Sequence, residues 1–256
     1  MHDGSASLRT LRRRRSLVWN VSGRSMTTQR RRLVIAVDGP VGAGKSTAAR
    51  RLAEVLGYLY IDSGAMYRAV GWKAVRTGVN LHDRNGIASM VEATDIRVAP
   101  GIPSARVLVD GRDVTDELRT RAMDEASSVV STYPEVRSRL VTLQRTMAEA
   151  GGIVMDGRDI GTVVFPDADL KFYLDADLSV RARRRLQDLR QRGADAGLEA
   201  VQADVARRDA RDRGRETSPL VMAAGAIQID STGLGADEVV YRMLAAIEKF
   251  GKPDKS

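Results

Sequence analysis

The sequence lacks cysteine, and histidine occurs in it only twice, as His2 and His82. The absence of cysteine excludes disulfide bonds and thiolate metal sites. Two histidines are too few for us to expect a multi-histidine metal site or a histidine-based catalytic triad. Aromatic residues make up only 4% of the chain, so we expect a largely aliphatic core. No apolar run approaches the length of a membrane span, and no membrane partner is predicted.

The excess of positive charge is confined to one end of the chain. The formal net charge is +8, and residues 1–32 contain nine arginines and one acid, Asp3, so the rest of the chain is formally neutral. Because this segment is poor in apolar residues, we expect a disordered Arg-rich extension. Met26 fits as the true start, which we favour over a targeting peptide or an RNA-binding arm. The high isoelectric point therefore says nothing about the folded part, for which no nucleic-acid partner is predicted.

Residues 33–47, with the sequence LVIAVDGPVGAGKST, carry the clearest functional pattern. Residues 33–37 are a continuous apolar run typical of a buried parallel strand, which Asp38 ends. Residues 39–46 fit GxxxxGK[ST], and a helix closed by Gly57 is predicted after them. Glycines let backbone N–H groups converge, and a helix N-terminus adds positive partial charge at the same place. The segment therefore predicts an anion site.

This anion site is of the type that binds a nucleoside triphosphate. In a P-loop the lysine, here Lys45, reaches the β and γ phosphates, and the hydroxyl that follows, here Ser46, is a ligand of Mg²⁺. The residues expected to bind the triphosphate are Gly39, Pro40, Val41, Gly42, Ala43, Gly44, Lys45, Ser46 and Thr47.

Strands and helices alternate over most of the chain, which predicts an α/β fold. Besides the strand at 33–37, strands are expected at residues 58–61, 153–155, 170–174 and 226–230. Helices are expected at residues 65–78, 177–193, 198–214 and 236–250.

Residues 80–150 interrupt this alternation, and we expect a small antiparallel insert there. A short helix is expected at 82–93, and β-like stretches at 95–99 and 106–109 are followed by Asp110-Gly111, a strong hairpin signal. Two further helices are expected at 116–131 and 133–150. His82 lies near a helix start, and a structural role is favoured for it.

A second strand end that opens a helix lies at residues 62–64. Asp62 or Ser63 is the expected N-cap, and the helix N-terminus makes this place a second candidate anion site. Arg68 lies one turn further and can reach back toward the terminus. The residue alone leaves a phosphate contact and a solvated helix position equally open.

Charged residues also follow the strand at 153–155, in the run Asp156-Gly157-Arg158-Asp159. The carboxyl end of a parallel strand faces the ligand crevice of an open α/β sheet, and charges are costly to bury there without partners. A functional site is therefore favoured. The helices at 177–193 and 198–214 are rich in arginine, although the folded part is neutral, and phosphate is the natural partner of such a local excess.

These features point to phosphoryl transfer between two nucleotides. The oxygens of a monophosphate are already largely anionic at neutral pH, so the acceptor needs no general base. Catalysis then depends on positioning and on neutralising the charge of the transferred group, for which arginines and Mg²⁺ suffice. A basic lid would also keep water away from the reaction.

Three strings resemble those of bacterial cytidylate kinases, members of the nucleoside monophosphate kinase family: DSGAMYR at 62–68, DGRDIGTVVFPDA at 156–168, and an RDxRDRxR run at 208–215 followed by SPL. The likeness extends from Leu33 to the C-terminal helix. It implies a P-loop three-layer sandwich with a five-stranded parallel core in 33–62, 147–189 and 216–256. It also implies a monophosphate-binding insert with a small antiparallel sheet in 63–146, and a helical lid in 190–215.

The resemblance implies direct in-line transfer from ATP, with Mg²⁺, to CMP or dCMP, giving CDP or dCDP in pyrimidine nucleotide metabolism. It further implies a cytoplasmic monomer whose partners are small nucleotides. The catalytic residues that it implies are Lys45, Arg158, Arg211 and Arg215. The CMP-binding residues that it implies are Ser63, Arg68, Ser128, Arg137, Asp156, Arg158, Asp159, Arg208, Asp212 and Arg215.

Roles follow from the same resemblance. Ser63, Arg68 and Arg158 are expected at the CMP phosphate. Ser128, Arg137 and Asp159 are expected to read cytosine, whose N3 and O2 acceptors and N4 amino group suit a hydroxyl, a guanidinium and a carboxylate. Of the lid residues, Arg208 and Asp212 are expected at the sugar and Arg211 and Arg215 at phosphates.

Two alternatives remain open from the sequence. One is another small P-loop kinase that acts on a different monophosphate or on a coenzyme precursor. The other is a nucleic-acid-binding protein anchored by residues 12–15, with the P-loop vestigial, which predicts RNA binding of steep salt dependence that disappears when residues 1–25 are deleted.

Overall fold

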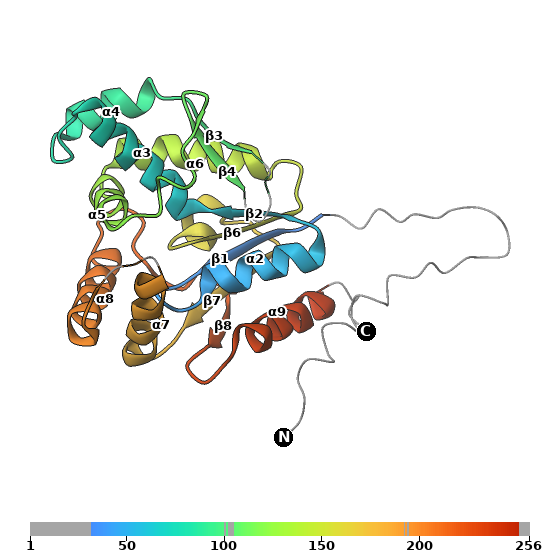
Figure 1. The fold of residues 1–256 in the computed structure, drawn as a ribbon. Coiled ribbons are helices and arrows are strands. Elements are labelled where there is room, and N and C mark those ends of the chain that lie inside the picture. The colour runs from blue at the N-terminus through green and yellow to red at the C-terminus, as the bar shows by residue number, and fades with distance from the viewer. Residues whose placement is uncertain (1–31, 100, 102–104, 192, 194, 251–256) are drawn as a thin grey trace, which may run out of the picture. The chain divides into compact units, whose positions relative to one another are not determined.

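A parallel sheet forms the centre of the fold (Figure 1). Its five strands are β1 (Val34–Asp38), β2 (Leu59–Asp62), β6 (Ile153–Gly157), β7 (Leu170–Asp175) and β8 (Ile227–Asp230), in the order β2-β6-β1-β7-β8. Every neighbouring pair is parallel. The predicted five-stranded parallel core is therefore confirmed, with each strand within two residues of its expected bounds.

The computed structural model describes residues 32–99, 101, 105–191, 193 and 195–250. The expected disorder of residues 1–32 and the proposed start at Met26 concern residues that lie outside this described part, apart from Arg32. The folded unit begins at Leu33.

Helices cover both faces of the sheet, because successive side chains of a buried strand point to opposite sides. On one face Ile35 and Val37 pack with α2 (Lys45–Leu56) and α9 (Ala236–Phe250). On the other face Ala36 packs with α3 (Ser63–Thr77) and α6 (Pro134–Ala148). The three-layer sandwich is thus confirmed.

The insert contains a second, three-stranded sheet, as predicted. Its antiparallel strands are β3 (Ile96–Ala99), β4 (Arg106–Val109) and β5 (Arg112–Asp113), and α4 (Arg84–Glu92) precedes them. Asp110 and Gly111 join β4 to β5 with φ angles of 50° and 79°. Two consecutive residues with positive φ make the tight turn that the Asp-Gly signal predicted.

The helix predicted over residues 116–131 is shorter than expected. The observed helix, α5 (Arg121–Val130), begins five residues later, because Thr120 has an extended backbone and its side chain accepts a hydrogen bond from the Met123 N–H. Val114 and Leu118 are buried ahead of this cap. Tertiary burial and capping therefore override the helical pattern at its start.

Two basic helices, α7 (Leu178–Gln191) and α8 (Leu198–Arg213), lie side by side near the carboxyl ends of the strands (Figure 1). Leu186 of α7 and Val201 and Val205 of α8 form an apolar cluster of their own. The two helices predicted at 177–193 and 198–214 are therefore confirmed, while the role of residues 190–215 as a lid remains a prediction. A further element, the π-helical segment η1 (Ile160–Val164), was not predicted from the sequence.

Candidate nucleotide-binding site

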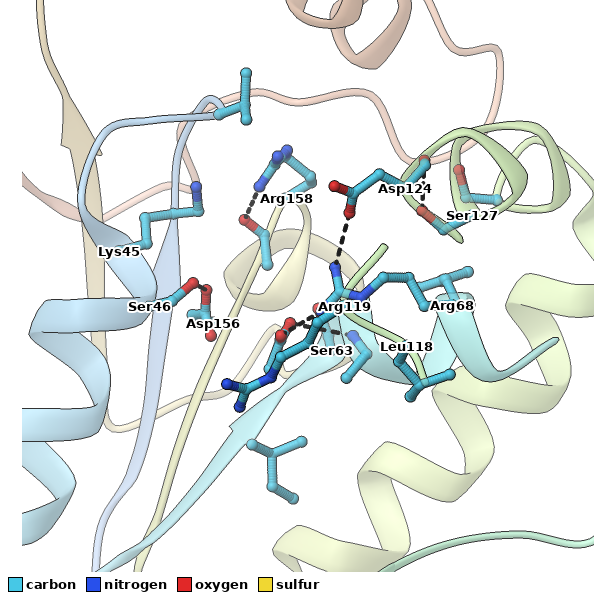
Figure 2. Close-up of a pocket in the computed structure, with 18 of the residues that line it drawn as sticks. Lys45, Ser46, Ser63, Arg68, Leu118, Arg119, Asp124, Ser127, Asp156 and Arg158 are labelled. Atoms are coloured by element: carbon cyan, nitrogen blue, oxygen red, sulfur yellow. Dashed lines mark hydrogen bonds and ion pairs between the residues drawn. The ribbon is translucent and has the colours of Figure 1, made fainter. Parts of the chain in front are cut away.

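A cavity of about 660 Å³ lies beside the carboxyl ends of β1, β2 and β6. Most residues that the sequence singled out line it: Val41, Gly42, Gly44, Lys45, Ser46, Thr47, Ser63, Arg68, Ser128, Arg137, Asp156, Arg158, Asp159, Arg208, Asp212 and Arg215. Gly39, Pro40, Ala43 and Arg211 are not among its lining residues. Figure 2 shows Lys45 and Ser46 on one side of the cavity, Arg68 and Asp124 on the other, and Arg158 between them.

Glycine is required at two points of the P-loop. Gly39 has a φ of 145°, and a Cβ on it would lie 1.9 Å from the Leu174 carbonyl oxygen. Gly42 has a φ of 77°, and a Cβ there would lie 2.6 Å from the Arg181 carbonyl oxygen. A side chain at either position would push the loop away from β7 and α7. The glycines therefore allow the loop to lie close against the core.

The N-terminus of α2 is open toward the cavity. Gly44 is its N-cap, and because glycine carries no capping side chain, the first N–H groups of the helix receive no side-chain hydrogen bond. The Lys45 Nζ donates to the Pro40 carbonyl oxygen at 2.7 Å, which bends the side chain over the loop. These donors and the partial positive charge of the helix end suit an anion such as phosphate.

Lys45 is buried among charges. Burial, and after it the nearby Arg158, lowers the pKa of the Lys45 ammonium to about 7, although Asp156, Asp38 and Asp212 act in the opposite direction. A triphosphate beside Lys45 would supply the negative charge that its ammonium needs, and would raise this pKa again.

A chain of hydroxyls and one carboxylate joins the P-loop to β2. The Ser46 Oγ donates to Asp156 Oδ2 and the Tyr60 hydroxyl donates to Asp156 Oδ1, both at 2.8 Å. Burial and the neighbouring Asp62 raise the pKa of Asp156 to about 6, while Lys45 and these two hydroxyls act against the rise. The resemblance implied that Asp156 binds CMP, whereas in the structure Asp156 accepts a hydrogen bond from the P-loop residue Ser46.

The donor set at Ser46 and Asp156 fits Mg²⁺. Both groups offer oxygen ligands, and they lie next to the loop in which the phosphates of a triphosphate would sit. Among the described residues no group of three or more His, Cys, Asp or Glu side chains is placed to hold a metal. Mg²⁺ is usually held by one or two protein oxygens together with phosphates and water, so Ser46 and Asp156 supply as many protein ligands as it needs.

The start of α3 is the second predicted anion site. Asp62 is its N-cap and accepts from the Ala65 N–H at 3.1 Å. Arg68 turns back, as expected, and its Nη2 donates to Asp62 Oδ2 at 2.6 Å. Ser63 lies against the end of β6, since a Cβ on Gly157 would lie 2.5 Å from the Ser63 Oγ. Hydroxyl and guanidinium donors therefore face the strand end that carries Arg158.

The three residues expected to read cytosine all line the cavity. Arg137 and Asp159 form an ion pair between Nη2 and Oδ2, and both side chains are 6% exposed. The Arg137 guanidinium also lies over the Tyr67 ring, 5.6 Å from its centre. Ser128 is held by another partner, because its Oγ accepts a hydrogen bond from the Arg211 Nη1.

The helix α8 places one carboxylate and several arginines next to Arg158, which follows β6. Arg158 donates from Nε to Asp212 Oδ2 at 2.8 Å, and Arg215 pairs with the other oxygen of Asp212. Within the described part of the chain, Arg208 makes no hydrogen bond or ion pair. Burial, followed by repulsion from Arg158, lowers the pKa of Arg208 to about 10. Arg208 is partly buried, and such a cation without a hydrogen-bonding partner is stabilised when an anion enters the cavity.

Sequence reasoning missed several residues of this site. Asp38 is buried, and its two carboxylate oxygens accept the Ile160 and Gly161 N–H groups at 2.8 and 2.7 Å. An acid at the end of a core strand, as at Asp62 and Asp156, was the available signal. Tyr60 and Tyr67 carried no comparable signal, since a tyrosine in a strand or helix pattern normally indicates packing.

Asp124 and Arg185 were also missed. Arg185 donates to Asp124 at 2.6 Å, and Asp124 lies 3.6 Å from an Arg68 nitrogen, so one carboxylate holds arginines from α7 and α3. This contact depends on how α5 and α7 meet, which a local pattern does not reveal.

The chain is similar in sequence to known cytidylate kinases. The family model described as cytidylate kinase matches residues 35–249. A cytidylate kinase of Symbiobacterium thermophilum is 51% identical over 220 residues, which are 86% of this chain and 97% of that protein. A cytidylate kinase of Geobacillus kaustophilus is 47% identical over 223 residues, 87% of this chain and 100% of that protein.

Among solved structures, a shikimate kinase of Acinetobacter baumannii in complex with shikimate aligns with a TM-score of 0.44 at 17% identity. The alignment covers 86% of this chain and 96% of that one. A likeness at this level carries no argument about substrate.

Proposed function

Because the chain belongs to the cytidylate kinase family, we propose that it transfers a phosphoryl group from ATP to CMP and dCMP, with CDP, dCDP and ADP as products. The family match confirms the resemblance seen in the sequence. The observation that carries the proposal is one cavity that joins a P-loop helix N-terminus, a second helix start with Ser63 and Arg68, and the Arg137–Asp159 pair.

The donor nucleotide is assigned to the P-loop. The N–H groups at the start of α2 and the Lys45 ammonium face the cavity, and they would hold the β and γ phosphates of ATP. Ser46 and Asp156 would hold Mg²⁺, which supplies charge neutralisation between the two phosphates when bound. The P-loop residues from Gly39 to Thr47 form this half of the site.

The acceptor nucleotide is assigned to the opposite wall. Ser63, Arg68 and Arg158 would bind the CMP phosphate, because their donors face the space next to the P-loop. The Asp159 carboxylate would accept a hydrogen bond from the N4 amino group of cytosine. Arg137 and Ser128 would donate hydrogen bonds to the N3 and O2 acceptors of the base. Uracil presents an oxygen where cytosine carries this amino group, so a buried carboxylate would repel it.

The lid residues complete the charge balance. Arg208 and Asp212 would contact the sugar, and Arg215 would meet the transferred group. Arg211 lies outside the cavity and donates to Ser128 in this structure, so it would have to turn to meet a phosphate. Guanidinium groups that are already in place stabilise the transition state without reorganisation of solvent. The monophosphate of CMP needs no base, since its oxygens are largely ionised at neutral pH.

The domain division follows from these assignments. The core comprises residues 33–62, 147–189 and 216–256, the insert that receives CMP residues 63–146, and the lid residues 190–215. We propose that the protein acts in the cytoplasm, where its nucleotide substrates occur. We further propose that it is a monomer. In the described part of the chain no helix is long and apolar enough to cross a membrane.

The test is a coupled assay of ADP formation with CMP, dCMP, UMP and AMP at equal concentrations. We expect CMP and dCMP to be phosphorylated with kcat/KM at least tenfold above UMP and AMP. A preference for UMP or AMP would contradict the proposal and favour another small P-loop kinase.

A further inference from the structure

The Asp156 carboxylate has two hydroxyl donors, and only one of them belongs to the P-loop. Asp156 is 3% exposed. Its Oδ2 accepts from Ser46 and its Oδ1 accepts from Tyr60, each at 2.8 Å. Two donors on opposite oxygens fix the rotation of a carboxylate about its last side-chain bond, whereas one donor leaves it free to turn.

Tyr60 reaches this position from the edge strand of the sheet. It lies on β2, opposite Val154 of β6, and its ring packs beneath α2 with the apolar cluster that contains Leu52. The ring fills space that phenylalanine would fill equally well. The hydroxyl therefore contributes polar contacts rather than packing, and these are with Asp156 and with the neighbouring Ser46 side chain.

The Ser46 hydroxyl keeps lone pairs for a metal while it donates its proton to Asp156. Its direction is then set by the orientation of the carboxylate, which Tyr60 fixes from the other side. Second contacts of this kind orient the groups that bind a metal directly, and their loss reduces metal affinity or activity by roughly tenfold to a hundredfold.

We propose that Tyr60 is a positioning residue of the magnesium site, whose hydroxyl fixes the Asp156 carboxylate and, through it, the Ser46 hydroxyl that faces Mg²⁺. The inference rests on the proposed function, because it takes a nucleotide in the P-loop for granted. Tyr60 lies in the wall of the cavity, and it acts on the Ser46 hydroxyl through Asp156 and by its own contact with Ser46.

The test variant is Tyr60→Phe, which removes one oxygen atom. The matched control is Tyr58→Phe, two residues earlier, because the Tyr58 hydroxyl accepts from the Leu33 N–H at 3.1 Å and does not line the cavity. The first measurement is the midpoint of thermal unfolding of the full chain with ADP alone and with ADP and Mg²⁺. The difference between these two midpoints reports Mg²⁺ binding without any turnover.

We expect Tyr60→Phe to keep the stabilisation by ADP alone and to lose most of the additional stabilisation by Mg²⁺, while Tyr58→Phe keeps both. In kinetics, the free Mg²⁺ concentration for half-maximal rate should rise about tenfold in Tyr60→Phe, with the KM for CMP within twofold of the unchanged protein.

Two results would overturn the inference. One is a rise of the unfolding midpoint on adding Mg²⁺ to the ADP complex of Tyr60→Phe that equals the rise in the unchanged protein. The other is an equal loss of stabilisation by ADP with and without Mg²⁺, which would assign the hydroxyl to packing. Failure of the proposed function is separate, because it appears as an unchanged protein that does not phosphorylate CMP.

Discussion

Arg158, at the end of β6, donates a hydrogen bond from Nε to Asp212 Oδ2 of α8 over 2.8 Å. The pair joins the core to the lid, and the Asp212 side chain is 2% exposed. Burial acts to raise the pKa of Asp212, but Arg158, Arg215 and Arg208 together outweigh burial and lower this pKa, so the carboxylate is ionised at neutral pH. The negative charge of Asp212 thereby offsets the repulsion between Arg158 and Arg215 while no phosphate is bound.

Lys45→Met is expected to abolish turnover, with a loss of kcat of at least about a hundredfold, because a preorganised charge at the transferred phosphate is removed. Stability should not fall, since the substitution removes a buried ammonium whose pKa burial has lowered to about 7. The measurements are kcat and the midpoint of urea unfolding. Lys73→Met, at a lysine outside the cavity that pairs with Asp110, is the control and should retain full activity.

Asp159→Ala is expected to raise the KM for CMP by at least about tenfold, or about 1.4 kcal/mol, while the KM for ATP changes little. Asp209→Ala is the matched control, because Asp209 also forms a buried ion pair, with Arg181, but lies outside the cavity. Both variants should lose stability, since each removes the nearest carboxylate from a buried guanidinium. Equal increases in the KM for CMP and in the KM for ATP in Asp159→Ala would exclude a role of Asp159 in recognising cytosine.

Arg208→Ala is expected to weaken CMP binding about tenfold without loss of stability. The Arg208 guanidinium is partly buried in the wall of the cavity, without a hydrogen-bonding partner in the described part of the chain. Its removal should therefore leave the free energy of unfolding unchanged or raise it by about 1 kcal/mol. Arg207→Ala, at the exposed neighbouring arginine, controls for the change in charge. A marked drop in stability of Arg208→Ala would show that this cation is paired in solution.

The Asp38 carboxylate predicts a pH dependence of stability. Burial raises its folded-state pKa from 3.8 to about 6, although the Gly161 and Ile160 N–H groups act against the rise. A raised pKa means that the contribution of Asp38 is fully present below pH 4 and is lost as the pH rises through 6. The loss is up to about 3 kcal/mol.

Urea unfolding of the unchanged protein and of Asp38→Asn between pH 4 and pH 7.5 measures this effect. The asparagine does not titrate, so the stability of the unchanged protein relative to the variant should decline across this range. A constant difference, or one that grows with pH, would contradict the assignment.

The sequence predicted those parts of the fold that local chemistry decides. The P-loop glycines, the Asp110-Gly111 turn and the cap at Asp62 are short-range features, and the structure confirms each of them. The predicted start of α5 at residue 116 was wrong, because burial of Leu118 and the cap at Thr120 together decide where this helix begins. Roles of single residues in the cavity remain predictions.

Contacts between distant segments were not predictable in the same way. The bond from Tyr60 to Asp156 and the pair of Arg185 with Asp124 depend on which strands and helices become neighbours. Strand order was likewise not predicted, because β6 enters between β1 and β2 from more than ninety residues further along the chain. A pattern of alternating strands and helices fixes the composition of a sheet but not its order.

The position of β6 between β1 and β2 has a mechanical consequence. The loop that follows β1 and the helix that follows β2 are two strand spacings apart, about 10 Å, and backbone hydrogen bonds on both sides of β6 fix that separation. If ATP and CMP bind as proposed, the rigid sheet sets how far the giving and receiving phosphates stand from each other, and the transfer distance stays constant.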